Sequence, residues 1–232
     1  MHKQKISHDG IPIIIYGEKS DKAFIHVHGK FGQKEEATIL ANIVVPKGYQ
    51  VISFDLPEHG ERKDVPYQCS IQNAVHDLIK VYMYFVDKYE SFSLYACSMG
   101  AYFSLTAYSD ITFEKCLFLS PLLNMKRLIE NMMRNLSISE ERLRKEKIID
   151  TPYGEKLSWE YYTYVIDNQI TEWNSSTSIL YGEKDNITEQ SVLFDFSNRF
   201  NCKFEIMKDG EHYFHTPEQI KYLNDWLARQ EY

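Results

Sequence analysis

The sequence predicts an α/β fold, a mostly parallel twisted sheet with helices on both faces. Short apolar runs typical of buried strands alternate along the chain with longer runs whose apolar residues recur every three or four positions. This alternation is typical of a parallel sheet whose strands are connected by helices. The 232 residues fit one domain of this kind, and the chain has no internal repeat that would favour another architecture.

The composition is that of a globular protein and restricts its partners. Hydrophobic residues make up 44% of the chain, charged residues make up 25%, and the net charge is −7. This acidic balance disfavours nucleic acid or an anionic membrane as partner, because both need a basic surface. No apolar stretch approaches the roughly 18 residues of a membrane span, and the N-terminal segment lacks signal-peptide features. We therefore expect a cytoplasmic protein without either partner; no pattern indicates its oligomeric state.

The first quarter of the chain predicts a hairpin and two buried strands around a helix. Residues 6–16 read as a hairpin that turns at Asp9-Gly10. Residues 23–27 and 50–54 are apolar runs of the length of one buried strand. Residues 35–45 have helical spacing and stop before Pro46, which disrupts the interior of a helix.

Two later helices carry start signals. Residues 71–89 share an apolar face, and Ser70 can cap their first turn. The last helix opens at Thr216-Pro217, with Gln219 placed to complete a capping box. The remaining predicted strands are residues 91–96, 116–119, 178–181 and 203–206, and the remaining predicted helices are residues 99–107 and 189–200.

The alternation stops between residues 122 and 176, which we call the 122–176 insertion. Its pattern is helix-like with no clear strand, charged at first and aromatic later. A segment of this length between consecutive strands is more often functional than a simple connection. We predict that residues 1–121 and 177–232 form the α/β core and that the insertion forms a helical lid.

Ser98 stands where a strand-like run gives way directly to a helix-like run. Small residues, Ala96 and Gly100, flank it two positions before and two positions after. This is the pattern of a nucleophile elbow, in which a sharp turn holds a serine hydroxyl above the sheet and points helix N–H groups at developing negative charge. The usual first glycine is replaced by alanine. A buried serine at a strand end is the alternative interpretation.

Two later loops supply the partners that an elbow serine needs. Asp185 follows the predicted strand at 178–181, and His212 follows the predicted strand at 203–206. A triad needs a base and an acid that orients the base, and in this topology they follow the serine in the order acid, histidine. We predict Ser98, Asp185 and His212 as the catalytic residues, with Glu183 as a fallback acid and His215 as a competing histidine turned away from the site.

Backbone amides and aromatic rings complete the predicted site. The oxyanion hole would use the amides of Met99 and Lys30, with the amide of Phe31 as the next choice after Lys30. His28 is expected to orient this loop by hydrogen bonds, and Cys97 is expected to point into the sheet. The predicted substrate contacts are Phe31, Trp159 and Tyr162. The alternative is that the aromatic rings of the insertion only pack it onto the core.

These motifs together resemble the α/β-hydrolase superfamily over nearly the whole chain. His28-Gly29 matches the family's oxyanion motif, and residues 54–62 are similar to its D-x-P-G-H-G segment, with Glu58 in place of the glycine. The His59-Gly60-Glu61-Arg62 form resembles small bacterial esterases and prolyl-oligopeptidase-like hydrolases. The resemblance implies that Asp55 and His59 are scaffold residues near the site and not catalysts.

The resemblance implies a serine hydrolase that cleaves a small-molecule acyl ester through an acyl-enzyme. It implies no metal and no organic cofactor. A peptidase or thioesterase would use the same triad on another leaving group. A non-catalytic ligand-binding protein that keeps the fold is the alternative from a different functional class.

Overall fold

The structure is a computed structural model that describes residues 1–152, 154 and 156–232. The two remaining positions belong to the predicted 122–176 insertion, so that part of the prediction lies outside the described residues. No helix in the described part of the chain combines the length and the apolar character that a membrane crossing requires.

An eight-stranded sheet forms the centre of the molecule, with strand order β1-β2-β4-β3-β5-β6-β9-β10. Strand β2 is antiparallel to both of its neighbours, and every other pairing in this sheet is parallel. The predicted fold class is therefore confirmed. The strands are β1 (Lys3–His8), β2 (Ile11–Tyr16), β3 (Lys22–Val27), β4 (Gln50–Phe54), β5 (Ser91–Cys97), β6 (Cys116–Leu119), β9 (Thr177–Gly182) and β10 (Lys203–Met207).

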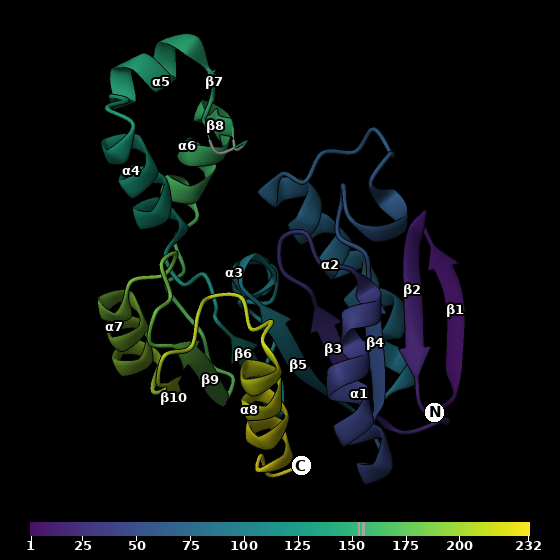
Figure 1. The fold of residues 1–232 in the computed structure, drawn as a ribbon. Coiled ribbons are helices and arrows are strands. Elements are labelled where there is room, and N and C mark those ends of the chain that lie inside the picture. Colours follow the sequence, from purple (N-terminus) through teal and green to yellow (C-terminus); the bar gives the residue numbers. More distant parts are fainter. Residues whose placement is uncertain (153, 155) are drawn as a thin grey trace.

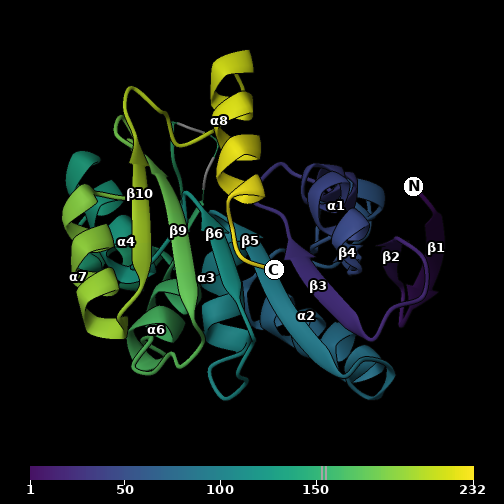
Figure 2. The same cartoon turned by 90° about the horizontal axis from the view of Figure 1, so that it is seen from below.

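Helices cover both faces of this sheet (Figure 2). The α-helices of the core are α1 (Thr38–Val44), α2 (Ile71–Phe85), α3 (Met99–Ala107), α7 (Gln190–Phe200) and α8 (Pro217–Ala228). Short 3-10 helices precede and follow α1, at Lys34–Ala37 and Val45–Lys47, so the single predicted helix at 35–45 is three pieces. The predicted helix at 71–89 likewise ends as α2 at Phe85, followed by a 3-10 turn at Val86–Lys88.

Alternating strand residues divide the core into two apolar clusters, one on each face. One cluster joins α1 and α8 to side chains such as Phe24, Tyr95 and Leu180. The other joins α2, α3 and α7 to side chains such as Ile25 and Leu94. Because neighbouring residues of a strand point to opposite faces, both helix layers pack on the same parallel strands.

The predicted turn and caps are present. Asp9 and Gly10 have φ of 50° and 76°, the left-handed conformation that a two-residue hairpin turn needs. The Ser70 hydroxyl accepts from the Asn73 amide at the start of α2. Thr216 and Gln219 form both hydrogen bonds of the capping box of α8.

The 122–176 insertion projects from the core as a lobe of its own in Figure 1. It contains α4 (Met125–Asn135), α5 (Glu140–Glu146) and α6 (Trp159–Asp167), together with a two-stranded antiparallel sheet of β7 (Ile148–Asp150) and β8 (Lys156–Ser158). The expectation of no strand in this segment is therefore wrong. Each of these strands has only three residues, too few to show an alternating pattern.

Candidate active site

Ser98 lies on a sharp turn between β5 and α3, as the sequence predicts. Its φ is 47° and its ψ is −117°, a conformation that an L-residue rarely adopts. A Cβ added at Gly100 would lie 2.3 Å from the His28 carbonyl oxygen, so this position must be glycine. The turn places the N-terminus of α3 directly after Ser98, where the first amides of the helix have no intrahelical acceptor.

The structure brings Ser98, His212 and Asp185 together. The Ser98 hydroxyl lies 2.7 Å from His212 Nε2, and His212 Nδ1 lies 2.7 Å from Asp185 Oδ2. The Asp185 side chain is fully buried and the His212 side chain is 11% exposed. The other Asp185 oxygen, Oδ1, accepts from the amides of Ile187 and Thr188. These contacts hold the carboxylate in one orientation beside the imidazole.

The two alternatives considered for these positions lie elsewhere. The Glu183 carboxylate accepts from the Asp209 amide at 2.9 Å rather than from His212. The His215 ring is half exposed and its Nδ1 lies 2.8 Å from the Tyr213 carbonyl oxygen. Of these four residues, His212 is the one that contacts Ser98, and Asp185 is the acid that contacts His212.

Gly182, at the end of β9, lets the acid loop and the histidine loop approach each other. A Cβ at this position would lie 2.4 Å from the Glu211 carbonyl oxygen and 2.6 Å from that of Gly210. The Lys184 amide donates to the Gly210 carbonyl at 2.7 Å, which ties the loops together. Since β9 and β10 are parallel neighbours, both loops leave the same edge of the sheet, where ligands bind in open α/β folds.

The loop after β3 lies against the nucleophile. A Cβ added at Gly29 would lie 3.3 Å from Ser98 Cβ. His28 accepts from the Leu56 amide at Nε2, 3.0 Å away, and its Nδ1 lies 2.7 Å from the Gly29 carbonyl oxygen. Burial lowers the pKa of His28 to about 4. The ring therefore stays neutral and can serve as acceptor and donor at once, which fixes the loop as predicted.

The chain was compared with family models, curated proteins and solved structures. The sequence matches no family model and no curated protein. The structure is similar to Est1E from Butyrivibrio proteoclasticus, solved with ferulic acid bound, with a TM-score of 0.74 and 17% identity over 97% of this chain and 96% of that one. It is similar to mouse alpha/beta hydrolase domain-containing protein 10, with a TM-score of 0.74 and 12% identity over 98% and 97% of the two chains. The chain has the α/β-hydrolase fold.

A third similar structure, the thioesterase domain from the curacin biosynthetic pathway, has a TM-score of 0.65 and 15% identity over 98% of this chain and 99% of that one. In the α/β-hydrolase fold the nucleophile follows a central strand and its partners follow later ones. Here Ser98 follows β5, Asp185 follows β9 and His212 follows β10.

A buried ionic cluster lies in the loops after β3 and β4, and the sequence did not reveal it. The Lys34 ammonium lies 2.7 Å from Asp55 Oδ2 and 2.8 Å from Glu61 Oε1. Both Lys34 and Asp55 are buried. Asp55 also accepts from the amides of Lys34 and Glu61. Burial alone would lower the pKa of Lys34, but the hydrogen bonds from Lys34 to the two carboxylates raise it above its ordinary value.

This cluster joins the loop after β3 to the loop after β4. Arg62 adds a second link, because it donates to the Asp55 carbonyl and to the Asp77 carboxylate. The resemblance pointed to Asp55 as a scaffold residue but gave no partner for it. A lysine among polar and charged neighbours, as in Gln33-Lys34-Glu35, is ordinarily taken as solvated, so the sequence carried no signal for its burial.

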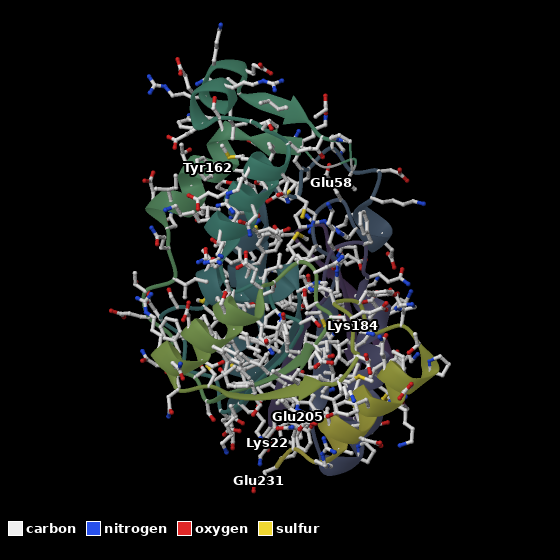
Figure 3. All side chains as sticks on the ribbon, turned by 60° about the vertical axis from the view of Figure 1, so that its left-hand side comes forward. Lys22, Glu58, Tyr162, Lys184, Glu205 and Glu231 are labelled. Carbon is white, nitrogen blue, oxygen red and sulfur yellow. The ribbon has the colours of Figure 1, made fainter. Side chains whose placement is uncertain are left out.

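The predicted substrate contacts lie in different environments. Phe31 is 87% exposed and has a φ of 63°. Trp159 is half-buried at the start of α6. Tyr162 is only 3% exposed, and its hydroxyl donates to Glu130 Oε1 at 3.2 Å. Figure 3 shows Tyr162 in the insertion, well apart from Lys184 of the acid loop. The structure therefore brings Tyr162 into the packing of the insertion and not to the triad.

The thiol of Cys97 lies next to Ser98 in the chain. Burial raises the pKa of the Cys97 thiol to about 12, so the neighbour of Ser98 carries a protonated and weakly nucleophilic thiol at neutral pH. Among the described residues, no group of three or more His, Cys, Asp or Glu side chains is arranged to hold a metal ion.

Proposed function

We propose that this chain is a serine hydrolase that cleaves a small-molecule carboxylic ester through Ser98, His212 and Asp185. The observation that carries the proposal is the continuous chain of contacts from the Ser98 hydroxyl through the imidazole to a buried carboxylate, each 2.7 Å long. A nucleophile, a base within hydrogen-bond reach and a third group that orients the base are the requirements for activating a serine. The fold supports this proposal, since it presents the three loops at one edge of the sheet.

The proposed reaction has two halves. His212 Nε2 takes the proton of Ser98 as its Oγ attacks the carbonyl carbon of the ester, and the amides of Met99 and Lys30 bind the developing oxyanion. The imidazolium then gives its proton to the departing alkoxide, which leaves the acyl group on Ser98. Water, deprotonated by His212, attacks the acyl carbon. The acid then leaves as Ser98 Oγ takes the proton back from the His212 imidazolium. Asp185 orients the imidazole and stabilises the imidazolium.

Phe31 and Trp159 are the proposed substrate contacts. An exposed phenylalanine with a positive φ gains little from burial and is in a strained backbone conformation. A contact with substrate at the mouth of the site would account for both features. The similar esterase Est1E, solved with ferulic acid, supports a small ester substrate. We propose that the 122–176 insertion acts as the lid, and that the four free cysteines reflect a cytoplasmic setting.

Labelling with a fluorophosphonate probe tests the nucleophile. The wild type should be labelled, Ser98→Ala should not, and Ser176→Ala, at an exposed serine outside the site, should be labelled like the wild type. A wild type that resists labelling under conditions that label other serine hydrolases would favour a non-catalytic binding protein. Labelling of Ser98→Ala at the wild-type rate would show that another residue is the nucleophile.

A substrate panel then tests the leaving group. p-Nitrophenyl esters of increasing acyl length, a matched thioester and a peptide anilide would be compared by kcat/KM. The proposal expects the ester to be the best substrate. A thioester preferred by a factor of ten would shift the assignment to a thioesterase, a class to which one of the similar structures belongs.

A further inference from the structure

A cavity of about 160 Å³ lies where the insertion meets the core, outside the candidate active site. Its walls come from the start of α4, the end of α6 and one side of α7, with Tyr102 of α3 as a further wall residue. None of Ser98, Asp185 and His212 lines it. In Figure 1 these helices surround the point where the insertion joins the core.

The cavity has apolar residues on its buried side and polar and cationic residues on its open side. Its buried lining residues are apolar or aromatic: Tyr102, Leu123, Met125, Val165, Val192 and Phe196. Three cationic residues, Lys126, Arg127 and Arg199, also line it, against one acidic residue, Asp195. A buried apolar side facing cationic side chains is complementary to a molecule with an apolar body and one negative end.

Arg199 differs from the other two cations in its partners. Lys126 lies 3.6 Å from the Glu130 carboxylate, and Arg127 forms an ion pair with Glu189. Arg199 donates to the Thr171 carbonyl at 3.2 Å, and within the described residues no carboxylate lies within 4.0 Å of its guanidinium. Arg199 can therefore pair with an incoming carboxylate without giving up an existing ion pair.

We propose that this cavity binds a small amphipathic carboxylate, with its apolar body against Val165, Val192 and Phe196 and its negative end at Arg199. The volume is similar to that of an engineered apolar cavity of about 150 Å³ that binds benzene, so one aromatic ring or a short chain fits. The ligand is either the acyl part of a substrate or a free carboxylate. Its binding does not depend on the proposed hydrolysis.

The cavity is positioned to affect the candidate active site. The Leu122 amide donates to the Ser98 carbonyl at 3.1 Å, and the next residue, Leu123, lines the cavity. Residues of the insertion and of α7 face each other across it, so a bound molecule contacts both. A ligand in the cavity would therefore hold the insertion against the core next to Leu122, the residue that is hydrogen-bonded to Ser98.

Calorimetric titration with 3-phenylpropionate tests the site, with 3-phenylpropan-1-ol as the neutral probe. The wild type should bind the carboxylate more tightly than the alcohol. Arg199→Gln should weaken binding of the carboxylate at least fivefold and leave binding of the alcohol unchanged. Arg134→Gln is the matched control, because Arg134 is an exposed arginine of α4 that does not line the cavity. It should bind both probes as the wild type does.

Absence of binding to the wild type at millimolar concentration would overturn the proposal, as would equal weakening in the two arginine variants. A second variant, Val192→Phe, fills the cavity and should abolish binding of both probes while circular dichroism shows the fold retained. Should that variant unfold, the Arg199→Gln comparison alone decides.

Inhibition of p-nitrophenyl acetate hydrolysis by 3-phenylpropionate then identifies the source of the natural ligand. Competitive inhibition indicates that the cavity is a subsite for the acyl part of a substrate, and non-competitive inhibition indicates that it binds a separate carboxylate. Failure of hydrolysis would leave the binding result intact and contradict only the proposed function.

Discussion

At the scale of single residues, a buried ionic cluster joins the loops after β3 and β4. Lys34 is a buried cation that forms ion pairs with Asp55 and Glu61. The Asp55 carboxylate also accepts hydrogen bonds from two backbone amides. Removing one partner of a buried pair leaves an uncompensated charge, whereas removing an exposed partner costs little. Substitution of Lys34 is therefore expected to lower the stability of the protein much more than substitution of Glu61.

Lys34→Met should destabilise the protein by about 3–5 kcal/mol, because Asp55 would remain buried without its counter-ion. Its kcat should also fall, since the loop after β3 loses its anchor. Urea unfolding and steady-state kinetics measure the two effects. Glu61→Gln is the control, as its side chain is more than half exposed and its loss should cost less than about 1 kcal/mol. Similar small changes in both variants would contradict the role given to the cluster.

His26 predicts a pH dependence of stability. Burial, followed by the nearby His28, lowers the pKa of His26 to about 3 in the folded protein, whereas an unfolded histidine titrates near 6.5. As the pH falls from 7 to 5, the unfolded chain gains a proton here that the folded chain does not, so the free energy of unfolding falls. The expected loss from this group is about 1–2 kcal/mol.

Urea unfolding at pH 7, 6 and 5 tests this pH dependence. His26→Asn should be less sensitive to pH than the wild type, while His2→Asn, at an exposed histidine, should match the wild type. Identical pH dependence in wild type and His26→Asn would show that this ring does not stay neutral in the fold.

The sequence predicts a residue's role where that role follows from the order of residues and strands along the chain. Ser98, Asp185 and His212 each follow a strand in the required order, so their convergence follows from the topology. Lys34 and Gly182 could not be predicted, because their roles arise from neighbours that approach only in the folded molecule. Tyr162 belongs to an aromatic helix, and a helical pattern does not distinguish a ring in a binding site from one that packs its own lobe.

At the scale of elements, the strands and caps of the core follow from local signals. Strand β4, helix α3 and strand β6 have the predicted boundaries. Helix ends were less predictable, because α1 and α2 each end in 3-10 turns that the apolar spacing alone does not distinguish. The short strands β7 and β8 were missed for lack of pattern length. Helix α8 offers a test at this scale, because it directly follows the histidine loop.

Thr216→Ala removes the side-chain half of the capping box of α8, and should reduce the free energy of unfolding by about 1 kcal/mol. Catalytic rates should change little, since His212 is held by Asp185 and not by the helix cap. Thermal or urea unfolding measures the effect. Thr171→Ala, at an exposed threonine outside any cap, is the control and should be within about 0.5 kcal/mol of wild type. Equal stability of the two variants would contradict the capping role.

At the scale of the whole molecule, the site depends on close packing between loops that are distant in sequence. The contact between Ser98 and His212 joins residues 114 positions apart. The loops of Asp185 and His212 are in contact through Gly182, where no Cβ can be accommodated. A change at this glycine should therefore affect the geometry of the site more than the rest of the fold.

Gly182→Ala should lower kcat by about a hundredfold, because even a 1 Å displacement of catalytic groups can have that effect. The added methyl group would push the Glu211 carbonyl and its loop away from β9, at a cost of about 1–3 kcal/mol in stability. Kinetics and urea unfolding separate the two effects. Gly10→Asn, at a turn glycine with no atom near its added Cβ, should leave kcat unchanged. Full activity of Gly182→Ala would show that the loops can separate without disturbing the triad.

The sequence separation of Ser98 and His212 also has a kinetic consequence. The two residues meet only when β5, β6, β9 and β10 have paired in order, and such distant contacts form late because loop closure precedes them. During refolding from urea, catalytic activity should therefore return more slowly than the circular dichroism of the helices. Activity in this protein would then report the last stage of chain assembly.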